Sequence, residues 1–169
     1  ALDKLMAAAR GRGPDVHLFV CLCALAGLRK GEAVAARWEW FDLEHRTVTV
    51  QAGHGFTPKD SDCRTIPLSE RLLAVLEPIA RAEGYLLAPG ASVRAARYGW
   101  NPKPAFARAA AAAGLEGVTP HTLRHTFASQ LVQAGVSVYK IQHWLGHAST
   151  ATTQIYAHLN GFDQDINRV

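Results

Sequence analysis

The sequence predicts an α+β domain that is mainly helical and carries one small antiparallel β-sheet. Apolar residues recur at helical spacing through most of the chain, and glycine or proline interrupts them at the expected helix ends. One central stretch, 47–68, is instead rich in β-branched residues and is divided by a polar turn. A length of 169 residues with 49% apolar side chains suits one domain with a sizeable core.

The N-terminal half changes from helices to strands. Its predicted elements are, in order, helices over 2–10, 15–26 and 32–38 and strands over 47–50 and 64–68. The second helix, capped by Asp15, is apolar on most sides and is therefore expected at the centre of the core. Gly27 and Gly31 permit a turn after this helix, so we expect Arg29 to be held in a fixed position between two buried helices. Lys59 lies on the polar tip between the two strands.

The C-terminal half is predicted to be almost entirely helical. Its elements are helices over 69–82, 105–113, 120–134 and 137–145, an extended piece over 85–88 and a connector over 90–104. Pro78 is expected to kink the first of these helices, and Gly146 to close the last. Ser149 or Thr150 then caps a short final helix that bears Tyr156.

The charge of the chain permits nucleic-acid binding without demanding it. The net charge is +4, from 18 basic and 14 acidic residues. Arginine outnumbers lysine by 13 to 5. This bias mildly favours a phosphate ligand, because the guanidinium fork matches phosphate oxygens.

The cysteines and the apolar runs indicate a reducing, cytoplasmic setting. Cys21, Cys23 and Cys63 form an odd set at no metal-ligand spacing, so we expect free thiols and no disulfide. The longest apolar run, 16–28, is too short to span a membrane and is broken by His17. No signal peptide is visible.

One helix start is suited to binding an anion. Thr119 can cap the helix and Pro120 fits its first position, where no backbone donor is lost. His121 and Arg124, three residues apart, share a face near the unpaired amides of that helix end. These features predict a phosphate or carboxylate site that can also transfer a proton.

In the order and spacing of its motifs, the chain resembles the catalytic domain of the tyrosine recombinases, the phage integrase family. The matching blocks are 27–32, Lys59 with 64–68, 119–128, 145–147 and 152–158. They extend over roughly 16–158, nearly the whole chain. Each block alone is a weak signal, whereas their occurrence in order is a strong one.

The resemblance implies cleavage and rejoining of DNA through a phosphotyrosyl intermediate on the 3′ end. Tyr156 is the implied nucleophile, and Lys59 the acid that protonates the leaving 5′ oxygen. The implied phosphate ligands are Arg29, Arg124, His121 and His147, of which His121 can also take the proton of the tyrosine. The resemblance implies no metal ion, no other cofactor and no ATP, because the covalent intermediate conserves the bond.

Each of these residues also has a structural explanation. Arg29 can be a helix-start arginine paired with Glu32, whose carboxylate we expect to orient the neighbouring cations. Lys59 alone is an ordinary exposed lysine, and Pro58 before it departs from the family pattern. His125, four residues after His121, is expected to brace its helix.

Three rival functions remain open. A zinc protein is possible because His121 with His125, and His143 with His147, are pairs at helical spacing, although no acidic ligand lies near them. A DNA-binding module without catalysis would use the same cations to hold backbone phosphates. Within enzymes, type IB topoisomerases use a very similar active site.

The resemblance also bears on domains and partners. We expect residues 1–169 to be one catalytic domain, from a protein whose N-terminal DNA-binding domain is absent here. The expected partner is double-stranded DNA, and the expected location is the cytoplasm, in association with a bacterial or phage nucleoid. In the family, exchange of C-terminal tails often assembles a homotetramer on DNA. Phe162 and Ile166 are the apolar candidates for such docking or, equally, for packing back onto their own domain.

Overall fold

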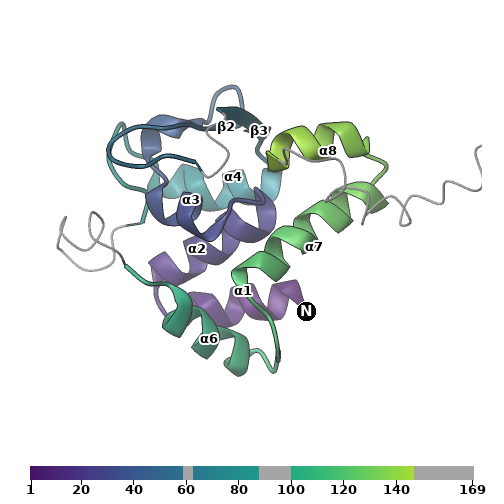
Figure 1. Ribbon diagram of the computed structural model, residues 1–169. Coiled ribbons are helices and arrows are strands. Elements are labelled where there is room, and N and C mark those ends of the chain that lie inside the picture. Colours follow the sequence, from purple (N-terminus) through teal and green to yellow (C-terminus); the bar gives the residue numbers. More distant parts are fainter. Residues whose placement is uncertain (59–62, 88–99, 147–169) are drawn as a thin grey trace, which may run out of the picture.

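The computed structural model describes residues 1–58, 63–87 and 100–146. The described part is mainly helical and has one three-stranded antiparallel sheet, which confirms the predicted fold class (Figure 1). Its helices are α1 (Leu2–Arg10), α2 (Pro14–Leu25), α3 (Lys30–Ala35), α4 (Glu70–Leu76), α6 (Lys103–Ala112), α7 (Pro120–Gln133) and α8 (Val138–Leu145). Two short 3-10 segments are η1 (Trp38–Trp40) and η2 (Glu77–Ile79), and the strands are β1 (Phe41–Asp42), β2 (Thr47–Val50) and β3 (Arg64–Pro67).

Helix α2 is the centre of the core, as its apolar sequence predicts. Every residue from Val16 to Leu25 is buried, and the helix packs against α1, α4, α6 and α7. Phe19 meets the edges of the Trp100 and Phe106 rings, with centroids 5.8 and 6.3 Å away. Figure 1 shows α1 and α6 at one end of the molecule and the sheet, beside α8, at the other. Because α2 contacts so many elements, it fixes the position of the turn that follows it.

The sheet has the strand order β1-β2-β3 and follows the alternation of its sequence. Val48 pairs with Ile66 on the buried face, while Thr49 pairs with Thr65 on the other face through their hydroxyl groups, 2.9 Å apart. Strand β1 was not predicted, because a pair of residues is too short to show an alternating pattern. Strand β3 contacts α8, so one edge of the sheet lies beside the end of the helical layer.

Three predicted helices differ from the structure at their ends. The helix expected over 105–113 begins at Lys103, inside the predicted connector, because Pro104 fits the first turn of a helix. The helix expected over 32–38 begins at Lys30 and ends at Ala35, because the Glu32 carboxylate accepts the backbone N–H of Arg29 and so closes the first turn two residues earlier. The helix expected over 69–82 stops at Leu76 and continues only as η2, since Pro78 has no N–H with which to extend it.

A further difference concerns the start of the central helix. Asp15 does not cap α2, because the cap position is Gly13 and Pro14 takes the first turn. Asp15 therefore lies in the first turn of α2, where its negative charge interacts favourably with the positive end of the helix dipole.

The two helices nearest the predicted anion site begin and end as expected. The Thr119 hydroxyl accepts the N–H of Thr122 at 3.2 Å, and Pro120 opens α7. Gly146 closes α8 in the left-handed conformation, with φ of 62°. The short final helix expected around Tyr156, and most of the 90–104 connector, lie outside the described residues.

Two broader expectations can be compared with the described chain. Cys21, Cys23 and Cys63 are all free thiols, the first two buried in the core. None of the described helices is both long enough and apolar enough to cross a membrane.

Candidate active site

Arg29 caps α3 and points its side chain at the end of α8. The preceding turn depends on Gly27, which has a φ of 63° and sets the chain up for the extended backbone of Arg29. The Arg29 guanidinium donates from Nη1 to Glu32 Oε1 at 3.2 Å and from Nη2 to the Gly146 carbonyl at 2.9 Å. Its side chain keeps 23% exposure, so this cation is held by the protein and still reaches the surface.

Arg124 lies deeper, under the same helix end. Only 4% of it is exposed, and its Nη1 donates to the Gly27 carbonyl at 2.6 Å. Its Nη2 donates to the Leu145 carbonyl. The structure therefore brings together two of the predicted cations, from the turn after α2 and from the first turns of α7.

A third arginine, which the site prediction did not include, completes this cluster. Arg64, at the start of β3, donates from Nη1 and Nη2 to the two carboxylate oxygens of Glu32, at 2.9 and 2.6 Å. Its Nε donates to the Trp144 carbonyl at 2.8 Å. The strand pattern contained a signal for this residue, because Arg64 and Ile66 fall on the same buried face.

Glu32 is the negative centre of the cluster. Burial by itself raises the pKa of this carboxyl, but the hydrogen bonds from Arg64 and the charges of Arg64 and Arg29 outweigh burial and lower it below its usual value. The carboxylate is thus ionised at neutral pH and is shared by two guanidinium groups. The expectation that Glu32 orients neighbouring cations is confirmed by these contacts.

The last carbonyls of α8 are each occupied by a different arginine. Trp144 accepts from Arg64, Leu145 from Arg124 and Gly146 from Arg29. The C-terminal end of a helix carries partial negative charge on such carbonyls, and cations stabilise it. Three elements distant in sequence therefore converge on one helix end and concentrate positive charge there.

His121 and His125 lie on α7 next to this cluster. Their rings meet edge to face with centroids 4.3 Å apart, and His121 is exposed whereas Arg124 is buried. Burial, and then the charges of His121 and Arg124, lower the pKa of His125. His125 thus packs against the exposed histidine, consistent with the bracing role expected from its position. Among the described residues, no group of three or more metal-ligating side chains is assembled.

The remaining predicted site residues are Lys59, His147 and Tyr156. All three lie outside the residues that the structure describes. Of the six predicted site residues, the described chain thus places Arg29, His121 and Arg124.

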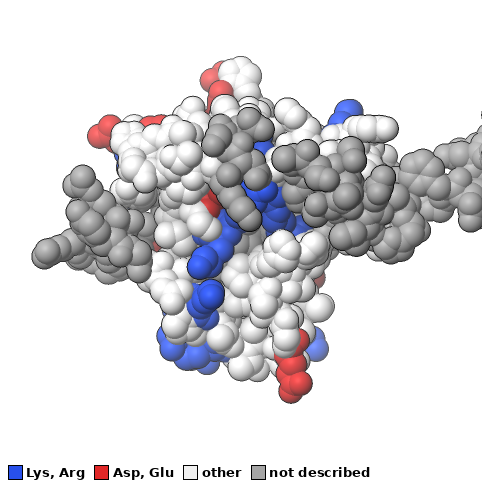
Figure 2. All heavy atoms as spheres, in the orientation of Figure 1, with Lys and Arg blue, Asp and Glu red and all other residues white. Residues whose placement is uncertain are grey.

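Positive charge continues from the cluster across the surface. In Figure 2, lysine and arginine side chains form a band that runs down this face of the molecule from the region of α3 toward α6. A groove of about 330 Å³ separates these helices, and Lys30 and Lys103 both line it. Lys30 directly follows Arg29, so the groove begins beside the arginine cluster.

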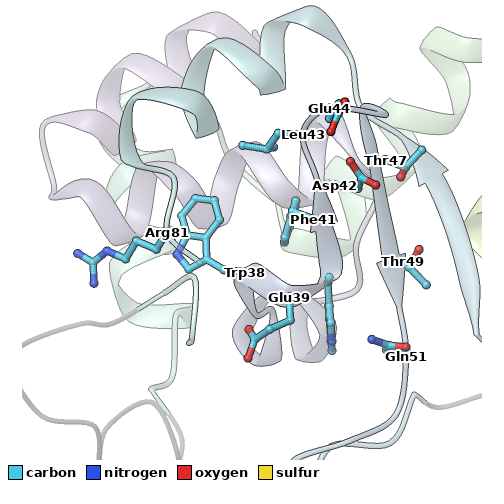
Figure 3. A pocket seen from close by; sticks show the side chains of 11 residues that line it. Trp38, Glu39, Phe41, Asp42, Leu43, Glu44, Thr47, Thr49, Gln51 and Arg81 are labelled. Atoms are coloured by element: carbon cyan, nitrogen blue, oxygen red, sulfur yellow. The ribbon is translucent and has the colours of Figure 1, made fainter. Parts of the chain in front are cut away.

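A larger hollow, of about 700 Å³, lies on the sheet between η1 and β2 (Figure 3). Its lining includes Glu39 and Asp42, but these acids already have partners. Glu39 bonds Arg37, and Asp42 bonds the ring of His45 at 2.7 Å. The hollow contains none of the predicted site residues that the structure describes.

The sequence of the chain is similar to those of known proteins over most of its length. A sequence model of the phage integrase family matches residues 1–161. Tyrosine recombinase XerA of Thermococcus kodakarensis is 36% identical over 148 residues, which are 83% of this chain and 49% of that protein. The chain therefore spans about half the length of this relative.

Solved structures agree with the sequence comparison. The crystal structure of XerA recombinase superposes with a TM-score of 0.72 at 30% identity and covers 95% of this chain and 59% of that one. The catalytic domain of bacteriophage HP1 integrase superposes with a TM-score of 0.74 at 25% identity and covers 98% and 89%. The described fold is thus shared with catalytic domains of recombinases and integrases.

Proposed function

The chain belongs to the phage integrase family, as its motifs predict, and we propose that it cleaves and rejoins DNA strands by site-specific recombination. The observation that carries this proposal is the convergence of Arg29 and Arg124 on the end of α8. Two guanidinium groups held this way form a preorganised cationic site of the kind that a phosphodiester in its transition state requires.

The proposed reaction exchanges one phosphodiester bond for another. The phenol oxygen of Tyr156 attacks the scissile phosphorus, and the bond from phosphorus to the 5′ oxygen breaks. The tyrosine proton leaves to a base, and the 5′ oxygen takes a proton to become a hydroxyl. The 5′ hydroxyl of a second strand then reverses the step, so ligation needs no further source of energy.

The arginines supply the electrostatic part of catalysis. Negative charge accumulates on the nonbridging phosphate oxygens as the nucleophile approaches, and fixed cations stabilise it without reorganising. A single well-placed donor in an oxyanion site contributes about 3 to 4 kcal/mol. Arg29, the more exposed of the two, is the one we assign to direct phosphate contact. We assign Arg124 to electrostatic stabilisation of the same phosphate charge from its buried position, next to the Gly27 carbonyl.

The other members of the site carry the protons. We assign Lys59 to protonation of the leaving 5′ oxygen and His147 to a hydrogen bond with a phosphate oxygen. His121 is exposed on the first turn of α7 and is suited to accept the proton of Tyr156 or to bind the phosphate. A phenol has an ordinary pKa near 10, so a base and nearby cations are needed to activate it at neutral pH.

The partner in this proposal is double-stranded DNA. The band of basic side chains, with the groove lined by Lys30 and Lys103, provides a path for backbone phosphates on either side of the scissile one. We further propose that copies of the protein assemble as a tetramer on DNA through their C-terminal tails, with Phe162 and Ile166 as apolar anchors.

A nicked suicide substrate tests the reaction. Cleavage next to the nick releases a short strand that cannot be rejoined, so a covalent protein–DNA adduct accumulates and is visible by denaturing electrophoresis. We expect the adduct with the wild-type chain and none with Tyr156→Phe, which keeps the ring but loses the nucleophile.

The control is Tyr139→Phe, because Tyr139 is exposed on α8 and 81% accessible. It should form as much adduct as the wild type. DNA binding without any tyrosine-dependent adduct, over a panel of candidate sites, would instead indicate a binding module. Relaxation of supercoiled DNA without site preference would indicate a topoisomerase.

A further inference from the structure

Arg64 is the most deeply buried cation of the cluster, and no role in the proposed reaction has been assigned to it. Its side chain is 3% exposed and faces Glu32, which is 2% exposed. A buried charge is retained in a fold only when it is paired and hydrogen-bonded, and Arg64 meets both conditions through its whole fork. The question is what this arrangement holds in place.

The Glu32 carboxylate joins Arg64 to Arg29 through both of its oxygens. Oε1 accepts from Arg64 Nη1 at 2.9 Å and from Arg29 Nη1 at 3.2 Å. Oε2 accepts from Arg64 Nη2 at 2.6 Å and from the Arg29 backbone N–H at 2.7 Å. Each oxygen therefore has one bond to each arginine. Because the fork of Arg64 fixes the plane of the carboxylate, it also fixes the backbone and the guanidinium of Arg29.

Arg64 also holds the helix end to which Arg29 is bonded. Its Nε donates to the Trp144 carbonyl at 2.8 Å. A Cβ atom at Gly146 would lie 3.0 Å from Arg64 Cδ and 3.3 Å from its Nε, so the arginine stem lies directly against this glycine. The Gly146 carbonyl in turn accepts from Arg29. Arg64 thus contacts both groups that hold the Arg29 guanidinium, namely the Glu32 carboxylate and the end of α8 at Gly146.

We propose that Arg64 is a positioning residue, which sets the phosphate-binding geometry of Arg29 by clamping the Glu32 carboxylate and the end of α8 together. The effect on rate rests on the proposed function, whereas the effect on Arg29 does not. Lysine cannot replace it, because an ammonium group is a single point of charge and cannot bridge two carboxylate oxygens while also reaching Trp144.

The first test reports on Arg29 without any reaction. In a 15N-labelled protein, the Arg29 amide proton, which donates to an ionised carboxylate, should resonate downfield and move upfield in Arg64→Lys. The matched control is Arg46→Lys, since the Arg46 side chain is 60% exposed and pairs with Glu70 at the surface, away from the arginine cluster. An Arg29 signal that moves no further in Arg64→Lys than in the control would overturn the proposal.

The second test separates positioning from DNA binding. With the nicked substrate, Arg64→Lys should lower the first-order rate of adduct formation at saturating DNA by on the order of 100-fold, the loss that a displacement of a catalytic group by about 1 Å can cause. The Kd for DNA should stay within about threefold, because the buried Arg64 does not reach a ligand. A loss confined to Kd, or a rate equal to that of Arg46→Lys, contradicts the positioning role.

A double variant keeps the test decisive if Arg64→Lys fails to fold. The variant Arg64→Met with Glu32→Gln removes both buried charges of this pair, so neither is left without its partner. It should therefore fold more readily than a variant in which only one of the two charges is removed. Because Arg64 also holds the Trp144 carbonyl, the double variant should react more slowly than Glu32→Gln, while its Kd for DNA stays within about threefold of the Glu32→Gln value. Equal rates in the two variants would contradict the proposed clamp on the end of α8. If the wild-type chain forms no Tyr156-dependent adduct, the proposed function fails, and the Arg29 signal still decides the positioning role.

Discussion

Gly27 lies in the turn after α2, directly against Phe127 of α7 and Leu145 of α8. Its φ of 63° is a conformation that residues with a Cβ adopt only at a cost. A Cβ atom built there would lie 2.5 and 2.9 Å from two ring atoms of Phe127 and 3.1 Å from Leu145 Cδ2. Phe127 is only 8% exposed, so its ring cannot swing into solvent. Gly27→Ala therefore combines backbone strain with overpacking.

The two contributions can be given magnitudes. The left-handed backbone costs a non-glycine residue about 1 to 2 kcal/mol. Forcing an extra carbon into a packed core costs about 1 to 3 kcal/mol. We therefore expect Gly27→Ala to lower the free energy of unfolding by about 2 to 5 kcal/mol, as measured by urea denaturation at neutral pH.

Gly114→Ala is the matched control for this experiment. Gly114 has nearly the same φ, 67°, and nothing lies within 4 Å of a Cβ placed there. Its replacement should cost only the backbone part, about 1 to 2 kcal/mol. The difference between the two variants then isolates the clash with Phe127 and Leu145. Equal losses of stability in the two variants would refute the close packing of this turn.

Three further predictions concern charge. In Glu32→Gln, one component of acid denaturation should disappear. The lowered pKa of Glu32 gives the wild type stability that is complete above about pH 4.3 and is lost as the pH falls through the folded-state pKa. An acid-denaturation curve of the variant that keeps this component would contradict the pairing of Glu32 with Arg64. Lys30→Ala and Lys103→Ala should each reduce the slope of the logarithm of the DNA-binding constant against the logarithm of the salt concentration by about 1. The control Lys4→Ala, at an exposed position of α1, should leave that slope unchanged. In His121→Asn, an NMR titration should find the pKa of His125 raised but still below about 6.5, since burial, the larger cause, remains; an unchanged pKa would argue against the charge coupling of the two rings.

The features that depend on local sequence could be predicted. The start of α7 follows from Thr119 and Pro120, and the end of α8 from Gly146, because these residues act on backbone groups within one turn. Ends set by distant contacts could not. The start of α3 depends on a carboxylate that Arg64 holds from another part of the fold, and β1 exists only because β2 pairs with it.

The candidate site divides in the same way. Arg29, His121 and Arg124 occur in motifs that the sequence alone reveals, so their position near one helix end could be expected. Arg64 occurs in one of the same motifs, but its role depends on Glu32 and Trp144, which are 32 and 80 positions away in the sequence. Strand alternation indicates that this arginine points inward, and only the fold reveals which groups it meets there.

The convergence of three arginines on the end of α8 has a consequence for the order of folding. The bonds from Arg29 and Arg124 close loops of 117 and 21 residues onto that end, and the bond from Arg64 closes one of 80. Long loops are costly to close before the rest of the chain is compact, so the longest of these contacts should form after the α2 core has assembled. Mutations that remove them should accelerate unfolding and leave the folding rate nearly unchanged. We therefore expect the contacts of Arg29 and Arg64 with this helix end to form late in folding and to break early in unfolding.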